Sequence, residues 1–290
     1  MSDKLFTQGH TACAGCGMVL ALRHVMEAAQ ELAGDDVIVV NGTSCSEIIS
    51  SQYPRTAWRC PYIHGAFENA GAIASGIESA LKAKGDDKTK VISISGDGGT
   101  FDIGLQSLSG ALERGHKITF VCLDNEAYMN TGIQRSGATP FGAWTTTSPV
   151  GSKSIGNPVW KKPIAEIVAA HGIPYVATAS MANIPDLRNK IKKALGKQPS
   201  FVHVYSACPI GWKSEGMDTI RIAKLAIDTG MWTQFEIEDG KFSLTEKSKG
   251  TPVGEYLKLQ GRFKHLQEGD IKIIQDIVNA SYERIQKKYI

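Results

Sequence analysis

The sequence predicts an α/β protein built on a largely parallel β-sheet with helices on both faces. Short apolar runs suited to buried strands alternate with longer helical segments, which is the pattern of repeated βαβ units. One such unit is especially clear: an apolar run over 91–95 leads through a glycine-rich turn and a helical segment into a second apolar run over 118–123. Open sheets of this kind bind ligands beyond the carboxyl ends of their strands.

The remaining elements follow the same alternation up to about residue 210. The pattern predicts strands over 37–40, 174–178 and 201–206, and helices over 18–32, 67–83, 164–171 and 184–195. A long polar loop over 145–158 interrupts it, and we expect this loop to cover a ligand or to meet another subunit, because long loops in compact domains are usually functional.

The pattern changes after residue 210. It predicts a helix over 217–228, a hairpin with strands over 232–237 and 241–244, and a final helix over 271–289. We therefore divide the chain into a domain over 1–210 and a C-terminal extension over 211–290, which packs on the domain or on partner subunits.

Composition excludes several classes of protein. The 290 residues are 42% hydrophobic and 21% charged, as in ordinary globular proteins, and a net charge of +3 without a long basic block argues against a nucleic-acid partner. No apolar run reaches the ~18 residues of a membrane span, and the stretch 1–10 lacks the apolar core of a signal peptide. We expect a cytoplasmic protein that has no membrane partner.

Polar residues mark the carboxyl ends of the two strands of the clear βαβ unit. The first strand ends in a turn formed by Gly96, Asp97, Gly98 and Gly99. Asn125 follows the second strand, so Asp97 and Asn125 lie close together if the strands are neighbours. Their oxygens suit Mg²⁺, which proteins usually hold with one or two carboxylates and substrate phosphates.

The turn itself suits a phosphate group. Glycines let the backbone approach a ligand closely, and a helix that begins near Phe101 directs its positive end toward phosphates. The residues therefore predict a site for Mg²⁺ and a diphosphate, with an ordinary βαβ turn carrying a polar tip as the alternative.

Cysteine spacing indicates a second site. The chain contains Cys13, Cys16, Cys45, Cys60, Cys122 and Cys208. The first two form a C-x-x-C before a helix, whereas a thioredoxin-like dithiol should follow a strand. Cys45 and Cys208 each lie just past a strand end, on the same sheet edge as the diphosphate site, and a proline follows Cys208 as at the last cysteine of ferredoxin-type cluster runs.

We expect four of these cysteines to bind one metal group: Cys13, Cys16, Cys45 and Cys208. Cys60 is the alternative ligand if one of these four does not bind the group. Cys122 lies inside a predicted strand as a small buried residue. The residues leave zinc and iron–sulfur both open, because each occupies a tetrahedral thiolate environment. In a cytoplasmic protein such cysteines indicate metal or redox chemistry rather than disulfides.

The Gly-Asp-Gly turn followed by Asn after the next strand resembles the thiamine diphosphate motif. In that family the Asp, the Asn and a carbonyl two residues beyond the Asn hold the metal. The resemblance implies Asp97, Asn125 and the carbonyl of Ala127 as Mg²⁺ ligands, and a thiamine-diphosphate-binding fold.

Further motifs resemble the β subunits of 2-oxoacid:ferredoxin oxidoreductases, and in particular those of pyruvate:ferredoxin oxidoreductase (pyruvate synthase). They are the runs HTACAGCG at 10–17, TSCS at 43–46, AYMNTG at 127–132, ATPFGA at 138–143 and YSACP at 205–209. The resemblance covers about residues 8–212, and the tryptophan-containing cysteine motif typical of the 2-oxoglutarate enzymes is missing.

The resemblance assigns roles to single residues. It implies that the four cysteines named above bind one [4Fe–4S] cluster. It also implies that Asn130 lies near substrate and cofactor as a catalytic residue. The alternative is that Asn130 only forms a turn before Thr131-Gly132. His64 is expected to line the cofactor site, unless it is a loop histidine with a structural hydrogen bond. Met18 stands where some members have a Glu.

The implied reaction is the reversible oxidative decarboxylation of pyruvate with coenzyme A, with electrons passing to ferredoxin. The Glu that activates thiamine comes from another subunit in this family, so we expect α-, γ- and δ-type partner subunits. Branched-chain 2-oxoacids and oxalate are alternative substrates. A non-redox thiamine decarboxylase with structural zinc, or a scaffold with a degenerate site, is a more distant alternative.

Overall fold

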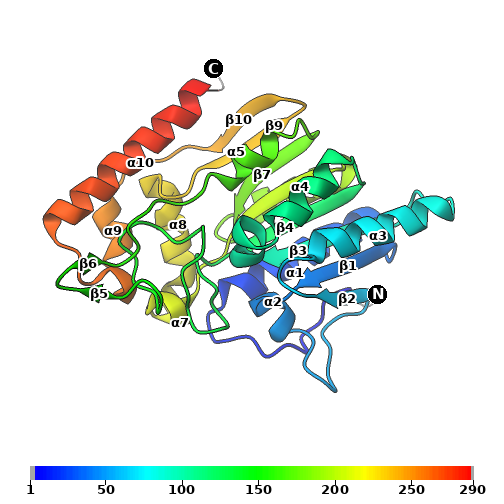
Figure 1. The fold of residues 1–290 in the computed structure, drawn as a ribbon, viewed down its shortest axis with the longest axis horizontal. Helices are drawn as coiled ribbons and strands as arrows, with labels where there is room; N and C mark the ends of the chain where they lie inside the picture. Colours follow the sequence, from blue (N-terminus) through cyan, green and yellow to red (C-terminus); the bar gives the residue numbers. More distant parts are fainter. Residues whose placement is uncertain (1–3, 289–290) are drawn as a thin grey trace.

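The computed structural model describes residues 4–288. Residues 1–3 of the N-terminal stretch, and Tyr289 at the end of the predicted final helix, lie outside the described residues. The chain forms one eight-stranded sheet in the order β10-β9-β7-β8-β4-β3-β1-β2 (Figure 1). Its strands are β1 (Val37–Gly42), β2 (Tyr62–Gly65), β3 (Lys90–Gly96), β4 (Ile118–Asp124), β7 (Tyr175–Ser180), β8 (Ser200–Tyr205), β9 (Gln234–Glu238) and β10 (Lys241–Glu246).

The six strands from β1 to β8 in this sheet are mutually parallel, and β9 pairs antiparallel with β7. Every residue of β4 is buried, as expected for a central strand whose two faces are both covered. The α-helices are α1 (Gly17–Ala33), α2 (Cys45–Ile48), α3 (Ala70–Ala83), α4 (Leu105–Glu113), α5 (Ile164–Ala169), α6 (Ile184–Gly196), α7 (Pro209–Trp212), α8 (Thr219–Thr229), α9 (Val253–Leu257) and α10 (Glu268–Lys288).

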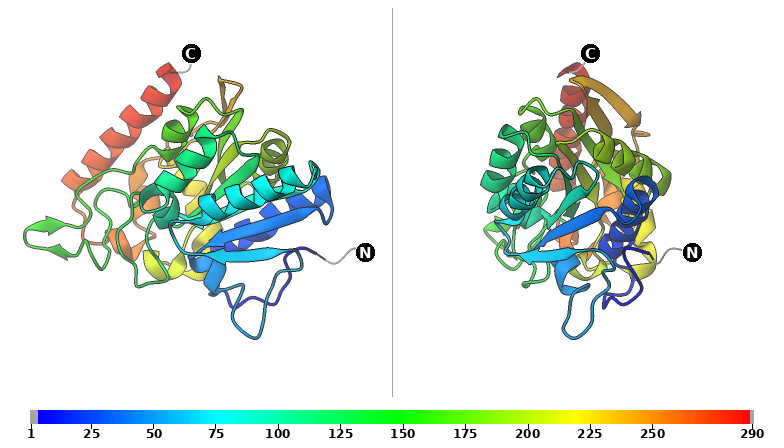
Figure 2. Two further views of the ribbon diagram at one scale, coloured as in Figure 1. Left: turned by 45° about the vertical axis from the view of Figure 1, so that its right-hand side comes forward. Right: turned by 90° about the vertical axis from the view of Figure 1, so that its right-hand side faces the viewer.

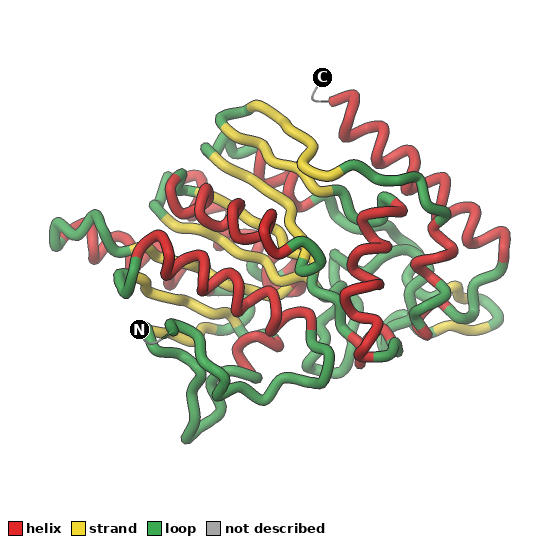
Figure 3. Tube along the Cα trace, turned by 180° about the vertical axis from the view of Figure 1, so that it is seen from behind, coloured by secondary structure: helices red, strands yellow, loops and turns green. Residues whose placement is uncertain are grey.

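Helices cover both faces of the sheet. α3, α4 and α5 pack on one face around Leu108 and Val168. α1 and α6 pack on the other, where Leu22 and Ile191 share a second core, and the view from behind shows helices crossing that face (Figure 3). The predicted α/β class with helices on both faces is confirmed, because α1, α3, α4, α5 and α6 each bury an apolar face against the strands.

Three local predictions differ from the structure. β2 was not predicted, because this short edge strand buries only Gly65 and lacks apolar alternation. Cys45 lies just past β1, but it opens a short helix, α2, that was not predicted. The α-helix predicted to begin near Phe101 begins at Leu105, because the glycine-rich turn first winds into a π-helical segment over Gly98–Asp102.

The C-terminal residues pack on the sheet and its helices. β9 and β10 form the predicted hairpin and extend the main sheet at its β7 edge. α10 stands along the side of the molecule opposite β2 (Figures 1 and 2), where Arg284 forms an ion pair with Glu166 of α5. Across residues 4–288, no helix has both the length and the apolar character required to span a bilayer.

The long polar loop contains a small hairpin of its own. β5 (Val150–Gly151) pairs with β6 (Ser154–Ile155), and this hairpin projects from the body of the molecule (Figure 2). The base of the loop is held by Asn157, whose buried side-chain nitrogen donates to the carbonyl oxygens of Thr139, Pro140 and Val159.

Candidate functional site

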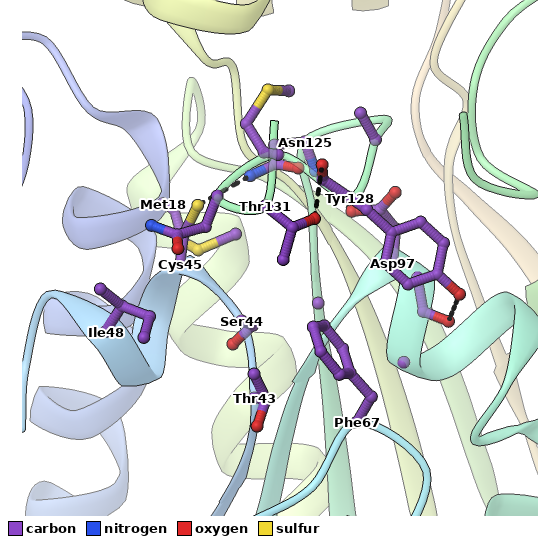
Figure 4. A pocket seen from close by; sticks show the side chains of 16 residues that line it. Met18, Thr43, Ser44, Cys45, Ile48, Phe67, Asp97, Asn125, Tyr128 and Thr131 are labelled. Carbon is purple, nitrogen blue, oxygen red and sulfur yellow. Dashed lines mark hydrogen bonds between the residues drawn. The ribbon is translucent and has the colours of Figure 1, made fainter. Parts of the chain in front are cut away.

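A pocket opens at the carboxyl ends of β1, β3 and β4 (Figure 4). The chain leaves β1 toward β2 on one side and leaves β3 toward β4 on the other, so the pocket lies where the strand order reverses, as in other open α/β sheets that bind ligands. It brings together eight of the predicted residues: Cys45, Gly96, Asp97, Gly98, Gly99, Asn125, Ala127 and Asn130.

Three oxygens converge in this pocket. The side-chain oxygen of Asn125 lies 3.0 Å from the carbonyl oxygen of Ala127 and 3.2 Å from Oδ1 of Asp97, with no donor between them. Rotating the amide by a half-turn would let its nitrogen donate to both. Without that rotation the spacing fits Mg²⁺, because adjacent octahedral ligands at about 2.1 Å from the ion lie about 3 Å apart.

The orientation with the oxygen inward also gives the amide nitrogen a partner. Nδ2 of Asn125 then points at Sγ of Cys45 at 3.9 Å, as the dashed line in Figure 4 marks. One amide group therefore lies between the predicted metal ligands and a predicted cluster ligand.

The Asp97 carboxyl group is buried, with only 1% of the residue exposed. Its Oδ2 accepts a hydrogen bond from the Ser136 hydroxyl at 2.5 Å, and its Oδ1 accepts one from the backbone N–H of Asn125 at 3.4 Å. Burial, together with the nearby Asp124 carboxylate, raises the pKa of Asp97 well above its usual value. A bound cation would oppose that shift, so this donor set is suited to Mg²⁺.

The glycines of the turn are required by the protein's own packing. A Cβ on Gly98 would overlap the ring of Tyr128, whose hydroxyl donates to the Gly98 carbonyl at 3.0 Å. A Cβ on Gly99 would overlap Oγ of Ser95 and lie 2.9 Å from the carbonyl oxygen of Phe67.

Replacing Gly99 with alanine should therefore destabilise the turn. We expect a loss of about 1–3 kcal/mol in unfolding free energy, typical of overpacking, and weaker binding of a diphosphate ligand, both measured on the purified chain. Gly76→Ala is the matched control, because a Cβ at this helical position meets nothing within 4 Å. It should stabilise by roughly 0.5–1 kcal/mol. Equal effects of the two changes would contradict this account.

The four predicted cluster cysteines lie close enough to affect one another. The pKa of Cys45 is raised to about 12, chiefly by burial and further by the neighbouring Cys208, Cys16, Asp97 and Cys13. The pKa of Cys208 is raised to about 11, chiefly by burial and further by Cys16 and Cys13. The Gly211 N–H, which lies 3.4 Å from the Cys208 Sγ, lowers this pKa.

The other cysteines do not contribute to the pKa shift of Cys60. Burial alone raises its pKa, to about 11, and a hydrogen bond from its own backbone opposes the shift. Cys122 is buried inside β4, as predicted. Within residues 4–288, no three His, Cys, Asp or Glu side chains are placed to hold a single ion.

Asn130 and His64 differ in their placement. Asn130 lines the mouth of the pocket and is exposed. The His64 side chain is 47% exposed and does not line the pocket; its Nε2 lies 2.9 Å from Oγ1 of Thr43, which does. The structural hydrogen bond considered for His64 is therefore present.

Other residues in and beside the pocket were not among the predicted site residues. Phe67 and Tyr128 contact each other edge to face, with ring centroids 5.8 Å apart, and form an apolar side of the pocket with Ile48. Ser136 reaches Asp97 across 39 positions of sequence, and nothing about a serine in a long loop marks it as a ligand partner.

Comparison with known proteins places this site in a family. Residues 42–204 match the family described as thiamine pyrophosphate enzyme, C-terminal TPP binding domain. The chain is 48% identical to pyruvate synthase subunit PorB of Methanothermobacter thermautotrophicus over 98% of each chain. It is 47% identical to ketoisovalerate oxidoreductase subunit VorB of Pyrococcus abyssi, over 98% of this chain and 93% of that one.

A solved structure shares the fold. It is a 2-oxoglutarate:ferredoxin oxidoreductase from Magnetococcus marinus, with a TM-score of 0.62 and 21% identity over 94% of this chain and 96% of that one. The chain therefore belongs to the thiamine pyrophosphate enzymes and, among them, to the 2-oxoacid oxidoreductase family that includes pyruvate synthase subunit PorB.

Proposed function

We propose that this chain is the subunit of a pyruvate:ferredoxin oxidoreductase that carries thiamine diphosphate, Mg²⁺ and one [4Fe–4S] cluster. The observation that supports this most is the position of the Asn125 side-chain amide, which lies between Asp97 and Ala127 on one side and Cys45 on the other. A thiamine site and an electron acceptor placed side by side suit an oxidative decarboxylation.

The chain's own residues have defined tasks in this proposal. Asp97, Asn125 and the Ala127 carbonyl hold Mg²⁺, and Ser136 orients the Asp97 carboxylate. When bound, thiamine diphosphate supplies the carbanion chemistry that releases CO₂ from a 2-oxoacid. Phe67 limits water on one side of the pocket, and Asn130 at its mouth offers an amide to the substrate.

A cluster suits the cysteines better than a single zinc ion. Each cysteine of a [4Fe–4S] cluster binds through a different iron, so the sulfurs surround the cluster instead of converging on one ion, as structural zinc requires. The thiols of Cys13 and Cys16 contribute to the pKa shifts of both Cys45 and Cys208, as thiols gathered around one cluster would. N–H groups facing the sulfurs also tune such clusters, and the Gly211 N–H is one of them.

The site requires a partner subunit. Asp97 is the sole Asp or Glu among the described residues that line the pocket, and metal binding occupies it. We infer that the carboxylate that activates thiamine comes from another chain, within a complex that also contains α-, γ- and δ-type subunits. Coenzyme A accepts the acyl group, and ferredoxin accepts the electrons.

The substrate is tested on the complex purified without oxygen. Reduction of ferredoxin should be measured with coenzyme A and, in turn, pyruvate, 3-methyl-2-oxobutanoate and oxalate. We expect the largest kcat/KM with pyruvate. A preference for 3-methyl-2-oxobutanoate would instead indicate a ketoisovalerate oxidoreductase, the activity for which the VorB relative is named. Decarboxylation without ferredoxin reduction by any substrate would contradict the redox proposal.

A further inference from the structure

The residue between two predicted metal ligands has an unusual backbone conformation. Glu126 lies between Asn125 and Ala127, and its φ is 67°. This left-handed conformation costs free energy for any residue with a Cβ, and it turns the chain so that the Ala127 carbonyl faces the Asn125 amide. Something must hold Glu126 in this conformation.

The Glu126 side chain is held by two cations from distant segments. Its carboxylate is fully buried; Oε1 pairs with Lys161, and Oε2 accepts from Nη2 of Arg262 at 2.5 Å. Arg262 comes from the C-terminal extension and is itself buried, with 2% of the residue exposed. A buried carboxylate without its cations is strongly destabilising, so the position of Glu126 follows the position of these two groups.

Arg262 is fixed in turn by its own neighbours. Its Nη2 donates to Oε1 of Gln260 at 2.8 Å and to the Tyr256 hydroxyl at 3.2 Å. Its guanidinium lies over the Trp212 ring, 4.0 Å from the ring centroid. The Trp212 indole N–H donates to the Asn125 carbonyl at 2.9 Å. Arg262 therefore contacts Glu126 directly and Asn125 through Trp212.

These contacts account for the backbone of the loop. The Glu126 N–H donates to Oδ1 of Asp124 at 2.8 Å, and the Glu126 carbonyl accepts from the Thr139 hydroxyl at 2.7 Å. Among the described residues, the Ala127 carbonyl accepts no hydrogen bond and faces the pocket. The backbone N–H and carbonyl groups of Asn125 and Glu126 are therefore all hydrogen-bonded, whereas, within residues 4–288, the Ala127 oxygen that would bind the metal is not.

We propose that Arg262, together with Lys161, is a positioning residue for the metal: it holds Glu126 in its left-handed conformation and thereby aims the Asn125 and Ala127 oxygens at Mg²⁺. The inference rests on the proposed magnesium site. It also gives the C-terminal extension a task in cofactor binding, because Arg262 reaches the loop across 136 positions of sequence.

The test is the Mn²⁺ affinity of the whole complex in the presence of thiamine diphosphate, followed by the EPR signal of free Mn²⁺. Arg262→Met should weaken Mn²⁺ binding about 10- to 100-fold, the usual effect of removing a residue that orients metal ligands. Arg284→Met is the matched control. Arg284 also ties the C-terminal extension to the domain, through Glu166 of α5. Its loss should change Mn²⁺ affinity less than about twofold, since its ion pair is with Glu166 and not with Glu126.

A rescue separates positioning from general stability. Glycine adopts positive φ freely, and it also removes the carboxylate left without Arg262. The double change Glu126→Gly with Arg262→Met should therefore recover most of the Mn²⁺ affinity, whatever its effect on the thermal unfolding midpoint. If the complex does not assemble with Arg262→Met, the same test is made with Arg262→Lys. Lysine keeps the charge but lacks the several N–H donors of the guanidinium, so we expect a smaller loss of Mn²⁺ affinity.

The outcomes are distinguishable. Unchanged Mn²⁺ affinity in the assembled Arg262 variant, with only a lower unfolding midpoint, would overturn the positioning role. A double variant as weak as Arg262→Met would do the same. If the unaltered complex binds no Mn²⁺ with thiamine diphosphate, the proposed magnesium site itself fails, independently of Arg262.

Discussion

Replacing Asp97 with asparagine should abolish metal-dependent binding of thiamine diphosphate while the chain remains folded. The change removes the one carboxylate from the three oxygens that face the proposed ion, and neutral oxygens alone bind Mg²⁺ poorly. We expect affinity to fall by more than about 100-fold, beyond the usual effect of changing a residue that only orients ligands.

The fold should tolerate this change. Asp97 is buried beside Asp124, and its pKa is raised by that burial and by the neighbouring charge, so an uncharged side chain of the same shape relieves repulsion. The Ser136 hydroxyl can still donate to the amide oxygen.

Thermal unfolding measures both expectations. Without ligand, the midpoint of Asp97→Asn should equal or exceed that of the unaltered chain. Added Mg²⁺ and thiamine diphosphate should raise the midpoint of the unaltered protein, since a ligand stabilises the state that binds it, and leave that of the variant unchanged. Asp35→Asn, an exposed change before β1, should respond like the unaltered protein. A full ligand response in Asp97→Asn would remove the proposed metal site.

The local pattern of the chain was enough to predict the centre of this site. The apolar runs of β3 and β4 are buried and parallel, so polar residues that directly follow them must meet at one edge of the sheet. That reasoning placed Asp97 and Asn125 in one pocket. It needed no knowledge of side-chain packing, because strand periodicity and direction determine which residues share an edge.

The residues that hold the proposed metal ligands in place could not be predicted in the same way. Glu126 is a charged residue that follows a strand, and the usual expectation for such a residue is exposure. Its burial depends on Lys161 from an irregular loop and on Arg262 from the C-terminal extension, neither of which lies in a periodic segment. Such contacts exist only after the chain has packed, so no local pattern records them.

The other large effect concerns the cysteines: Cys208→Ala should remove the proposed cluster. Cys208 immediately precedes α7; its Sγ accepts from the Gly211 N–H, and the thiols of Cys16 and Cys13 contribute to its raised pKa. A [4Fe–4S] cluster with three remaining cysteines loses the anchor of one iron. Iron and acid-labile sulfide should fall by about four each per chain, or to a degraded remnant, and the reduced-cluster EPR signal of this subunit should disappear.

Cys60→Ala provides the matched control. Cys60 is also a partly buried thiol, but the other cysteines do not contribute to its pKa shift, so its removal should leave iron and sulfide unchanged. If Cys60→Ala lost the iron and Cys208→Ala kept it, the fourth ligand would be Cys60. Zinc without sulfide in the unaltered protein would replace the cluster by a structural ion and favour a non-redox decarboxylase.

The Cys208 variant should also separate the two cofactors. Of the four cysteines, Cys45 contacts Asn125 and lines the thiamine pocket, whereas Cys208 does neither. Binding of Mg²⁺ and thiamine diphosphate should therefore survive in Cys208→Ala, while reduction of ferredoxin by pyruvate is lost. If thiamine binding were lost together with the iron, the cluster would be a structural part of the pocket, and the contact between Asn125 and Cys45 would be the first place to look for the connection.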